Sequence, residues 1–361
     1  MAYDFFPKKA SEITQELEKN NWNIENISEV VSLFSHLKKK FPAVEAPINI
    51  DKNQRSVINI SRSLQEEIAI PALKSTLKLS KLKPKFGNGS SGNRGVNNRG
   101  NLFEPQFADA FIDWWNGKTI TNTAMKNAIE HIYESYDLKK TNEILLDIVG
   151  GENTRRPLTF AGNSIVLDNP KGTGFNVGAS VTDITLEPKG MKPIFLSLKL
   201  GTTTTFFNVG VKTILTKQEI QQSSIKNRNG LILLKTFGID ESLFCDVFNG
   251  VKIPNNKRIV RNPSFNKSAI EKLLRSGIGH GYHIVHKMSS TIISKKMDEA
   301  AMRKAATISG TYVIYYGGKT GTGKRIDVEF ESATYAFKIN LRDTQGTDGY
   351  PTRMMCDFKY K

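Results

Sequence analysis

The sequence predicts a mixed α/β protein of the α+β type, with a mixed central sheet flanked by helices. Three observations support this class. Residues 178–201 form two alternating runs around a turn rich in Pro, Gly and Lys, which is the pattern of a β-hairpin. Apolar residues recur at helical spacing in residues 103–149. Alternating segments between residues 311 and 360 predict antiparallel strands at the C-terminus.

The composition indicates a polyanionic partner. The chain has 361 residues, enough for two or three domains or one elaborated core, and carries a formal net charge of +16. Lys and Arg gain affinity for nucleic acids by releasing counterions from phosphates, so DNA is the first partner to expect. A basic surface that only favours solubility is the alternative.

Cysteine usage and hydropathy predict a cytoplasmic protein. Two cysteines, Cys245 and Cys356, are too few for a disulfide framework, and we expect buried, reduced thiols. There is no apolar run of 18 residues and no signal-peptide core, so no membrane contact is expected. The basic, Asn- and Gly-rich style resembles phage or mobile-element proteins, which suggests a phage-infected bacterium. A homodimer is one arrangement that the sequence allows.

In chain order, residues 1–80 predict an N-terminal helical region, with two short amphipathic helices in 10–40 and a third helix, or a broken pair, in 53–80. Residues 81–101 form a basic, Gly- and Asn-rich segment with few apolar residues. A flexible linker and a basic arm that orders against a nucleic-acid backbone are both open interpretations. The nucleic-acid contacts expected from the arm are Lys81, Lys83, Lys85, Arg94 and Arg99.

Residues 102–255 predict the main core, and residues 256–361 predict an α/β extension. In the core, helices at 103–149, among them 121–135 and 139–149, precede strands near 157–167, 174–187 and 193–200. Further helices follow at 213–224, 230–237 and 240–249. In the extension, helices at 267–275 and 294–307 precede strands at 311–317, 325–331, 333–341 and 353–360.

The hairpin places polar side chains on one face. Ile194, Leu196, Leu198 and Leu200 alternate with Phe195, Ser197 and Lys199 along the second run. In the first run, Ile184 and Leu186 share a face, and Asp183 and Glu187 lie opposite. If the two apolar faces are buried together, Asp183 lies towards Ser197 and Lys199.

This hairpin resembles that of the PD-(D/E)XK nuclease superfamily, in which an aspartate ends one strand and an acidic-X-lysine triplet lies on the next. Asp183 matches the aspartate, and Ser197-Leu198-Lys199 occupies the place of the triplet, with Ser197 replacing the acid. The segment that begins at Arg99 resembles the preceding helix, which often adds a glutamate, here Glu104. The resemblance covers about residues 99–225 and implies a restriction-endonuclease-like or Holliday-junction-resolvase-like core.

The resemblance implies a Mg²⁺- or Mn²⁺-dependent endonuclease acting on DNA. It makes Asp183 the principal metal ligand, assisted by Glu104 and by the backbone carbonyl of Leu198. Lys199 would hold the attacking water or stabilise charge on the phosphate. Ser197 would bind a metal-bound water. Two further polar residues are candidates: Gln218 on a following helix as a donor to the site, and Glu187, which should lie roughly 13 Å from Asp183 along a regular strand.

Alternatives to a nuclease remain open at the same residues. Loss of the acid at Ser197 favours a non-catalytic nucleic-acid-binding or virion structural protein on a degenerate scaffold. Asp183 and Lys199 can instead form a plain cross-strand ion pair. Glu104 lies in the first turn of the predicted helix, where it can simply complement the helix dipole.

Two other motifs have simpler explanations. Residues 318–324 (Gly-Lys-Thr-Gly-Thr-Gly-Lys) fit the first seven places of a phosphate-binding loop, but Arg325 and a strand follow, so we expect a hairpin turn. His280, His283 and His286 are spaced by three among glycines, which favours loop and strand histidines over a metal site.

Overall fold

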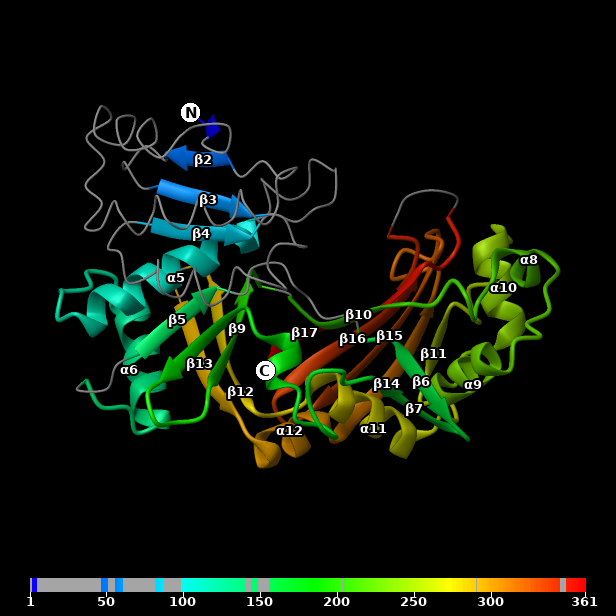
Figure 1. Cartoon of the computed structure of the whole chain (residues 1–361). Helices are drawn as coiled ribbons and strands as arrows, with labels where there is room; N and C mark the ends of the chain where they lie inside the picture. The colour runs from blue at the N-terminus through cyan, green and yellow to red at the C-terminus, as the bar shows by residue number, and fades with distance from the viewer. Residues whose placement is uncertain are drawn as a thin grey trace. The chain divides into compact units, whose positions relative to one another are not determined.

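The computed structural model describes residues 2–4, 47–50, 56–60, 82–86, 99–140, 144–148, 156–202, 204–289, 291–344 and 349–361. It divides the chain into two compact units (Figure 1). The first comprises Met1–Asn153, Val181–Lys199 and His283–Lys295, and the second comprises Thr154–Ser180, Leu200–Tyr282 and Lys296–Lys361. Both units are discontinuous in sequence, whereas the sequence analysis divides the chain into successive segments. The α+β class is confirmed, and the restriction-endonuclease-like arrangement stays a prediction.

The first unit contains a sheet in the order β1-β2-β3-β4, formed by Ala2–Asp4, Pro47–Ile50, Ser56–Ile60 and Leu82–Phe86. Strand β3 lies within residues 53–80, where a helix was predicted. That prediction is wrong, because Val57, Ile58 and Ile60 are β-branched and favour a strand. Strand β4 pairs in parallel with β3 and contains Lys83 and Lys85, which the sequence analysis assigned to a linker or arm. Lys81, Arg94 and the helices predicted in 10–40 lie outside the described residues.

The second sheet of this unit has the order β13-β12-β9-β8-β5. Its strands are β5 (Ile144–Ile148), β8 (Ile184–Pro188), β9 (Ile194–Leu200), β12 (Tyr282–Met288) and β13 (Thr291–Met297). The predicted hairpin is confirmed: β8 and β9 are antiparallel, with Ile184 opposite Leu196 and Leu186 opposite Ile194. All four side chains are buried, so the opposite face carries the polar residues.

Helices α5 (Arg99–Trp115) and α6 (Thr123–Ser135) pack against each other, and α5 also contacts β5. Phe103, Phe107 and Phe111 are almost fully buried, which confirms their predicted core role. The helix predicted at 139–149 is wrong, because β5 occupies 144–148 and pairs antiparallel with β8. Residues 178–181 form the short helix α7 (Gly178–Val181), so the strand predicted from 174 begins only at Ile184.

The second unit contains an antiparallel sheet in the order β10-β17-β16-β15-β14-β11. Its strands are β10 (Thr204–Gly210), β11 (Ile259–Arg261), β14 (Ile308–Tyr316), β15 (Arg325–Ser332), β16 (Tyr335–Arg342) and β17 (Arg353–Tyr360). The C-terminal meander predicted from sequence is confirmed.

Helices pack on one face of this sheet, where α10 contacts β14 and β15, α12 contacts β15, and α11 contacts β10. The helices of the unit are α8 (Lys217–Gln221), α9 (Arg228–Phe237), α10 (Glu241–Asn249), α11 (Lys267–Ile278) and α12 (Glu299–Ala306). Only the second half of the helix predicted at 294–307 is helical. Residues up to Met297 continue β13, and the Asp298 side chain caps α12 by accepting from the Ala301 N–H at 2.8 Å. The hairpin of β6 (Leu158–Ala161) and β7 (Ser164–Leu167) packs on α11.

The glycine-rich loop and the spaced histidines form the turn and the strand that the sequence predicts. The glycine-rich residues form a turn between β14 and β15, closed by hydrogen bonds from the Gly317 N–H to the Arg325 carbonyl (2.9 Å) and from the Gly323 N–H to the Gly317 carbonyl (2.9 Å). His283 and His286 lie on β12, where a spacing of three puts them on opposite faces. Cys245 and Cys356 are buried free thiols, as predicted. Within the described residues, no helix has the length and apolarity needed to cross a membrane.

Candidate active site

Asp183 is fixed by the second strand of its own hairpin. It lies just before β8, and its N–H donates to the Leu196 carbonyl at 2.8 Å, which extends the strand pairing by one residue. Its Oδ2 accepts the Leu198 N–H at 2.6 Å and the Ser197 hydroxyl at 3.4 Å. The carboxylate is therefore held against β9 by bonds that the hairpin register itself creates.

Lys199 comes from the same face of β9 as Ser197. Burial raises the pKa of Asp183, while the Lys199 ammonium and the bonds from Leu198 and Ser197 oppose this shift. Ser197 is buried and Lys199 is half-buried. The hairpin thus brings an acid and an amine together on a partly covered sheet surface, as the alternation of side chains predicted.

Glu104 reaches the same place from α5. Burial raises the pKa of Glu104 to about 7; the nearby Asp183 carboxylate adds to this shift and the Lys199 ammonium opposes it. Because α5 begins at Arg99, Glu104 lies in its second turn, and the first turn contains no acid. Complementing the helix dipole, which acts over the first turn, is therefore not an adequate explanation for Glu104.

Two carboxylates around one ammonium leave a negative charge surplus. Burial raises the pKa values of both carboxyl groups, and repulsion by the Asp183 carboxylate adds to the shift at Glu104. A divalent cation would relieve this cost, and carboxylate oxygens are the hard ligands that Mg²⁺ and Mn²⁺ prefer. Both hydrogen bonds that the described residues donate to the Asp183 carboxylate use Oδ2, so Oδ1 is the better placed oxygen for a cation.

The remaining ligands would be backbone carbonyls and water. In the described part of the chain, no group of three or more His, Cys, Asp or Glu side chains is arranged to hold a metal ion. In an antiparallel pair, the N–H and C=O of one residue point towards the same neighbouring strand. The Leu198 carbonyl therefore faces the same side as the N–H that binds Asp183. These residues fit a cation held by two carboxylates and a carbonyl.

Two predicted candidates belong to other parts of the fold. Glu187 pairs with Leu145 of β5, towards the other end of β8 from Asp183. Gln218 lies on α8 in the second unit. Arg99 is the first residue of α5.

Strand β5 adds a position that sequence reasoning missed. Its register places Asp147 opposite Thr185, which in turn lies opposite Phe195 on the polar face of the hairpin. Because the sequence predicts a helix over 139–149, it does not predict that Asp147 pairs with a residue of β8. The β-branched Ile144 and Ile148 at the ends of the segment were the available signal.

No protein-family model, curated protein or solved structure matches the chain. The interpretation of the site therefore depends on its own geometry.

Proposed function

We propose that the chain is a metal-dependent nuclease that hydrolyses phosphodiester bonds in DNA. The observation that carries the proposal is the electrostatic interaction of Glu104, Asp183 and Lys199, which come from a helix and from both sides of a hairpin. The net charge of +16 supports a polyanionic substrate.

Asp183 and Glu104 would hold Mg²⁺ or Mn²⁺, together with the Leu198 carbonyl. When bound, the ion would polarise the phosphate and lower the pKa of an attacking water. Ser197 and the Leu198 N–H keep the Asp183 carboxylate in one orientation through the bonds to its Oδ2. Such preorganisation matters because a misplaced ligand loses much of its effect on the reaction.

Lys199 supplies a positive charge beside both carboxylates, where charge develops on the phosphate during hydrolysis. The Glu104 carboxyl has a pKa of about 7 because it is buried beside Asp183, so it would give up its proton when it binds the cation. These roles make the site a cation centre with an adjacent ammonium.

The test uses purified protein and supercoiled plasmid DNA with Mn²⁺. We expect nicking by wild type and its loss in Asp183→Asn and Lys199→Met. Glu187→Gln is the matched control, because it removes one carboxylate from the other end of the same strand. Circular dichroism shows whether each variant is folded. Cleavage at the wild-type rate by folded Asp183→Asn and Lys199→Met would exclude the proposal.

A non-catalytic nucleic-acid-binding or virion structural protein is the second candidate. Ser197 favours it, since this residue donates to Asp183 instead of adding a carboxylate. This candidate expects DNA binding that persists in chelator, with no cleavage in any divalent ion. Gain of cleavage on Ser197→Asp would identify a degenerate nuclease site.

A further inference from the structure

Three arginines lie side by side across the sheet of the second unit. Arg325 opens β15, Arg342 closes β16 and Arg353 opens β17. The strand register places Arg325 opposite Arg342 and Arg342 opposite Arg353. Directly opposite residues share one face of a sheet and stand about 5 Å apart at their Cα atoms. We call these three residues the arginine row.

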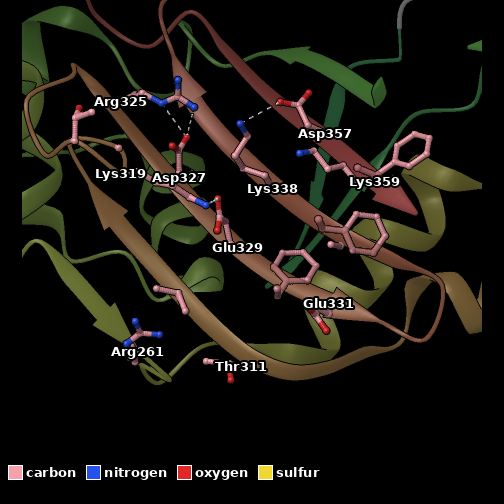
Figure 2. A pocket seen from close by; sticks show the side chains of 17 residues that line it. Arg261, Thr311, Lys319, Arg325, Asp327, Glu329, Glu331, Lys338, Asp357 and Lys359 are labelled. Carbon is pink, nitrogen blue, oxygen red and sulfur yellow. Dashed lines mark hydrogen bonds and ion pairs between the residues drawn. The ribbon is translucent and has the colours of Figure 1, made fainter. Parts of the chain in front are cut away.

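The arginine row is on the sheet face that carries charged side chains. Figure 2 shows this face, where Arg325, Asp327, Lys338 and Asp357 project from neighbouring strands into a hollow of about 710 Å³. The opposite face carries buried side chains such as Ile326, beneath the helices. The row follows one end of the strands, and its first member lines the hollow.

Elsewhere on this face, every acid of the hollow is paired with a base. Each acid that lines the hollow lies within 4.0 Å of a basic side chain: Arg325–Asp327, Lys319–Glu329, Lys338–Asp357 and Lys361–Glu331. Asp357 also accepts from Thr205 at 2.7 Å and from Asn340 at 2.9 Å. The acids of the hollow are therefore engaged by neighbouring bases.

The arginine row is not matched in this way. Arg325 binds Asp327 through Nε at 3.0 Å and Nη2 at 2.5 Å. Arg342 donates Nη2 to the Met355 sulfur at 3.5 Å, a weak acceptor, and its Nε is buried without a hydrogen-bond partner among the described residues. Nη1 of Arg353 lies 3.9 Å from where a Cβ would stand on Gly210, the residue opposite it on β10.

Like charges directly opposite each other destabilise a sheet, and a buried unpaired donor adds to the cost. An anion from solution would offset both costs. We propose that the arginine row binds the oxygens of a phosphate group, with Arg342 at its centre. Guanidinium groups match phosphate because their planar fork donates two parallel hydrogen bonds.

Neighbouring residues add positive charge at the same end of the strands. Lys324 precedes Arg325 and lies against Gly349. The ammonium groups of Lys324 and Lys217 each stand 5.4 Å from the centre of the Tyr350 ring. Asp343, which follows Arg342, accepts from the Thr352 hydroxyl and the Gly349 N–H, both at 3.2 Å. Its carboxylate therefore binds the β16–β17 connection.

Two sources can supply the phosphate: a nucleic-acid backbone or a free phosphate ion. Both are tested with the full chain in chelator, so that the result does not depend on cleavage. Inorganic phosphate is titrated by calorimetry, and a fluorescent 20-nucleotide single-stranded DNA is titrated by anisotropy at several salt concentrations.

We expect Arg342→Met to weaken binding of at least one of these probes by about tenfold, the scale of a lost charge-assisted hydrogen-bond pair. If DNA is the ligand, the slope of log affinity against log salt also falls by about one. Arg342→Lys keeps the charge but not the fork and should also weaken binding. Arg303→Gln on α12 is the control for net charge, because Arg303 is exposed and already paired with Glu299.

A response to phosphate alone assigns the site to a free ion, and a response to DNA assigns it to the backbone. Wild-type affinity of Arg342→Met for both probes would overturn the proposal. If Arg342→Met fails to fold, Arg353→Met provides the same comparison from the edge of the row. A folded Arg353→Met with unchanged affinities would likewise overturn it.

Discussion

The hairpin of the first unit and the arginine row of the second are both electrically unbalanced, in opposite directions. On the hairpin, the carboxylates of Glu104 and Asp183 share the ammonium of Lys199. In the row, three guanidinium groups have one carboxylate, Asp327, in direct contact. Folding alone favours neither arrangement, because unpaired charge costs stability wherever it is partly buried. The sign of each surplus indicates the partner: a cation for the hairpin and an anion for the row.

The largest expected effect concerns the carboxylates of the hairpin site. Asp183→Asn removes the charge but keeps the size of the side chain and its ability to accept the Leu198 N–H. We expect Mn²⁺-dependent cleavage to fall by about 1,000-fold, the scale of a lost metal or electrostatic contact in catalysis. Single-turnover rates on labelled DNA measure this loss.

Metal binding should fall in parallel, as seen by Mn²⁺ electron paramagnetic resonance. Unchanged Mn²⁺ affinity together with lost cleavage would remove Asp183 from the ligand set. Glu187→Gln, on the same strand, should keep both properties.

The next effect concerns stability and pH at Glu104. Its pKa is about 7 in the folded chain, against 4.5 for an unperturbed glutamate. The folded state therefore keeps the proton to higher pH than the unfolded state, and stability falls as pH rises from about 4.5 to about 7. The shift corresponds to about 3 kcal/mol. Glu104→Gln should abolish this fall, so that urea denaturation finds the variant more stable than wild type at pH 8 and similar at pH 4.5.

Mn²⁺ sharpens the Glu104 test. Because Mn²⁺ would bind the ionised carboxylates of Glu104 and Asp183, it should raise the free energy of unfolding of the wild-type chain above pH 7. The increase should be smaller for Glu104→Gln. If wild type shows no loss of stability between pH 5 and pH 8, Glu104 is not held near Asp183 in the manner described.

The sequence was sufficient for the hairpin and insufficient for the arginine row, for a physical reason. Asp183 and Lys199 lie on strands joined by a short turn, so period-two alternation alone assigns their face. Arg325 and Arg342 are likewise joined by the short turn between Ser332 and Tyr335, but Arg353 joins them only once the register of β17 is known, and the loop between β16 and β17 does not specify that register in sequence. Patterning correctly predicted β14–β17 as strands but gave no pairing offset.

Errors in the sequence analysis have the same origin. Strand β5 was predicted as a helix because Ile144-Leu-Leu-Asp-Ile has too few residues to separate the two periods. Its partner β8 lies about 40 residues away in sequence, and pairing with β8 decides its state. Strands β3 and β4 were likewise missed, because pairing between separate segments defines them.

The smallest expected effect breaks the second half of the comparison. If the arginine row binds an anion, the positive charge of Arg342 should lower the free energy of unfolding when no anion is bound. Arg342→Met should therefore be as stable as wild type, or up to about 1 kcal/mol more stable, in the absence of the ligand. If Arg342 instead stabilised the fold, Arg342→Met would lower the free energy of unfolding. Urea denaturation in chloride buffer measures this difference, which should shrink at high salt as repulsion is screened. Arg303→Gln, which removes an exposed ion pair with Glu299, should instead cost about 0.3 kcal/mol. A clear loss of stability in Arg342→Met at low salt would mean that the row supports the fold, and that its positive surplus is not reserved for a ligand.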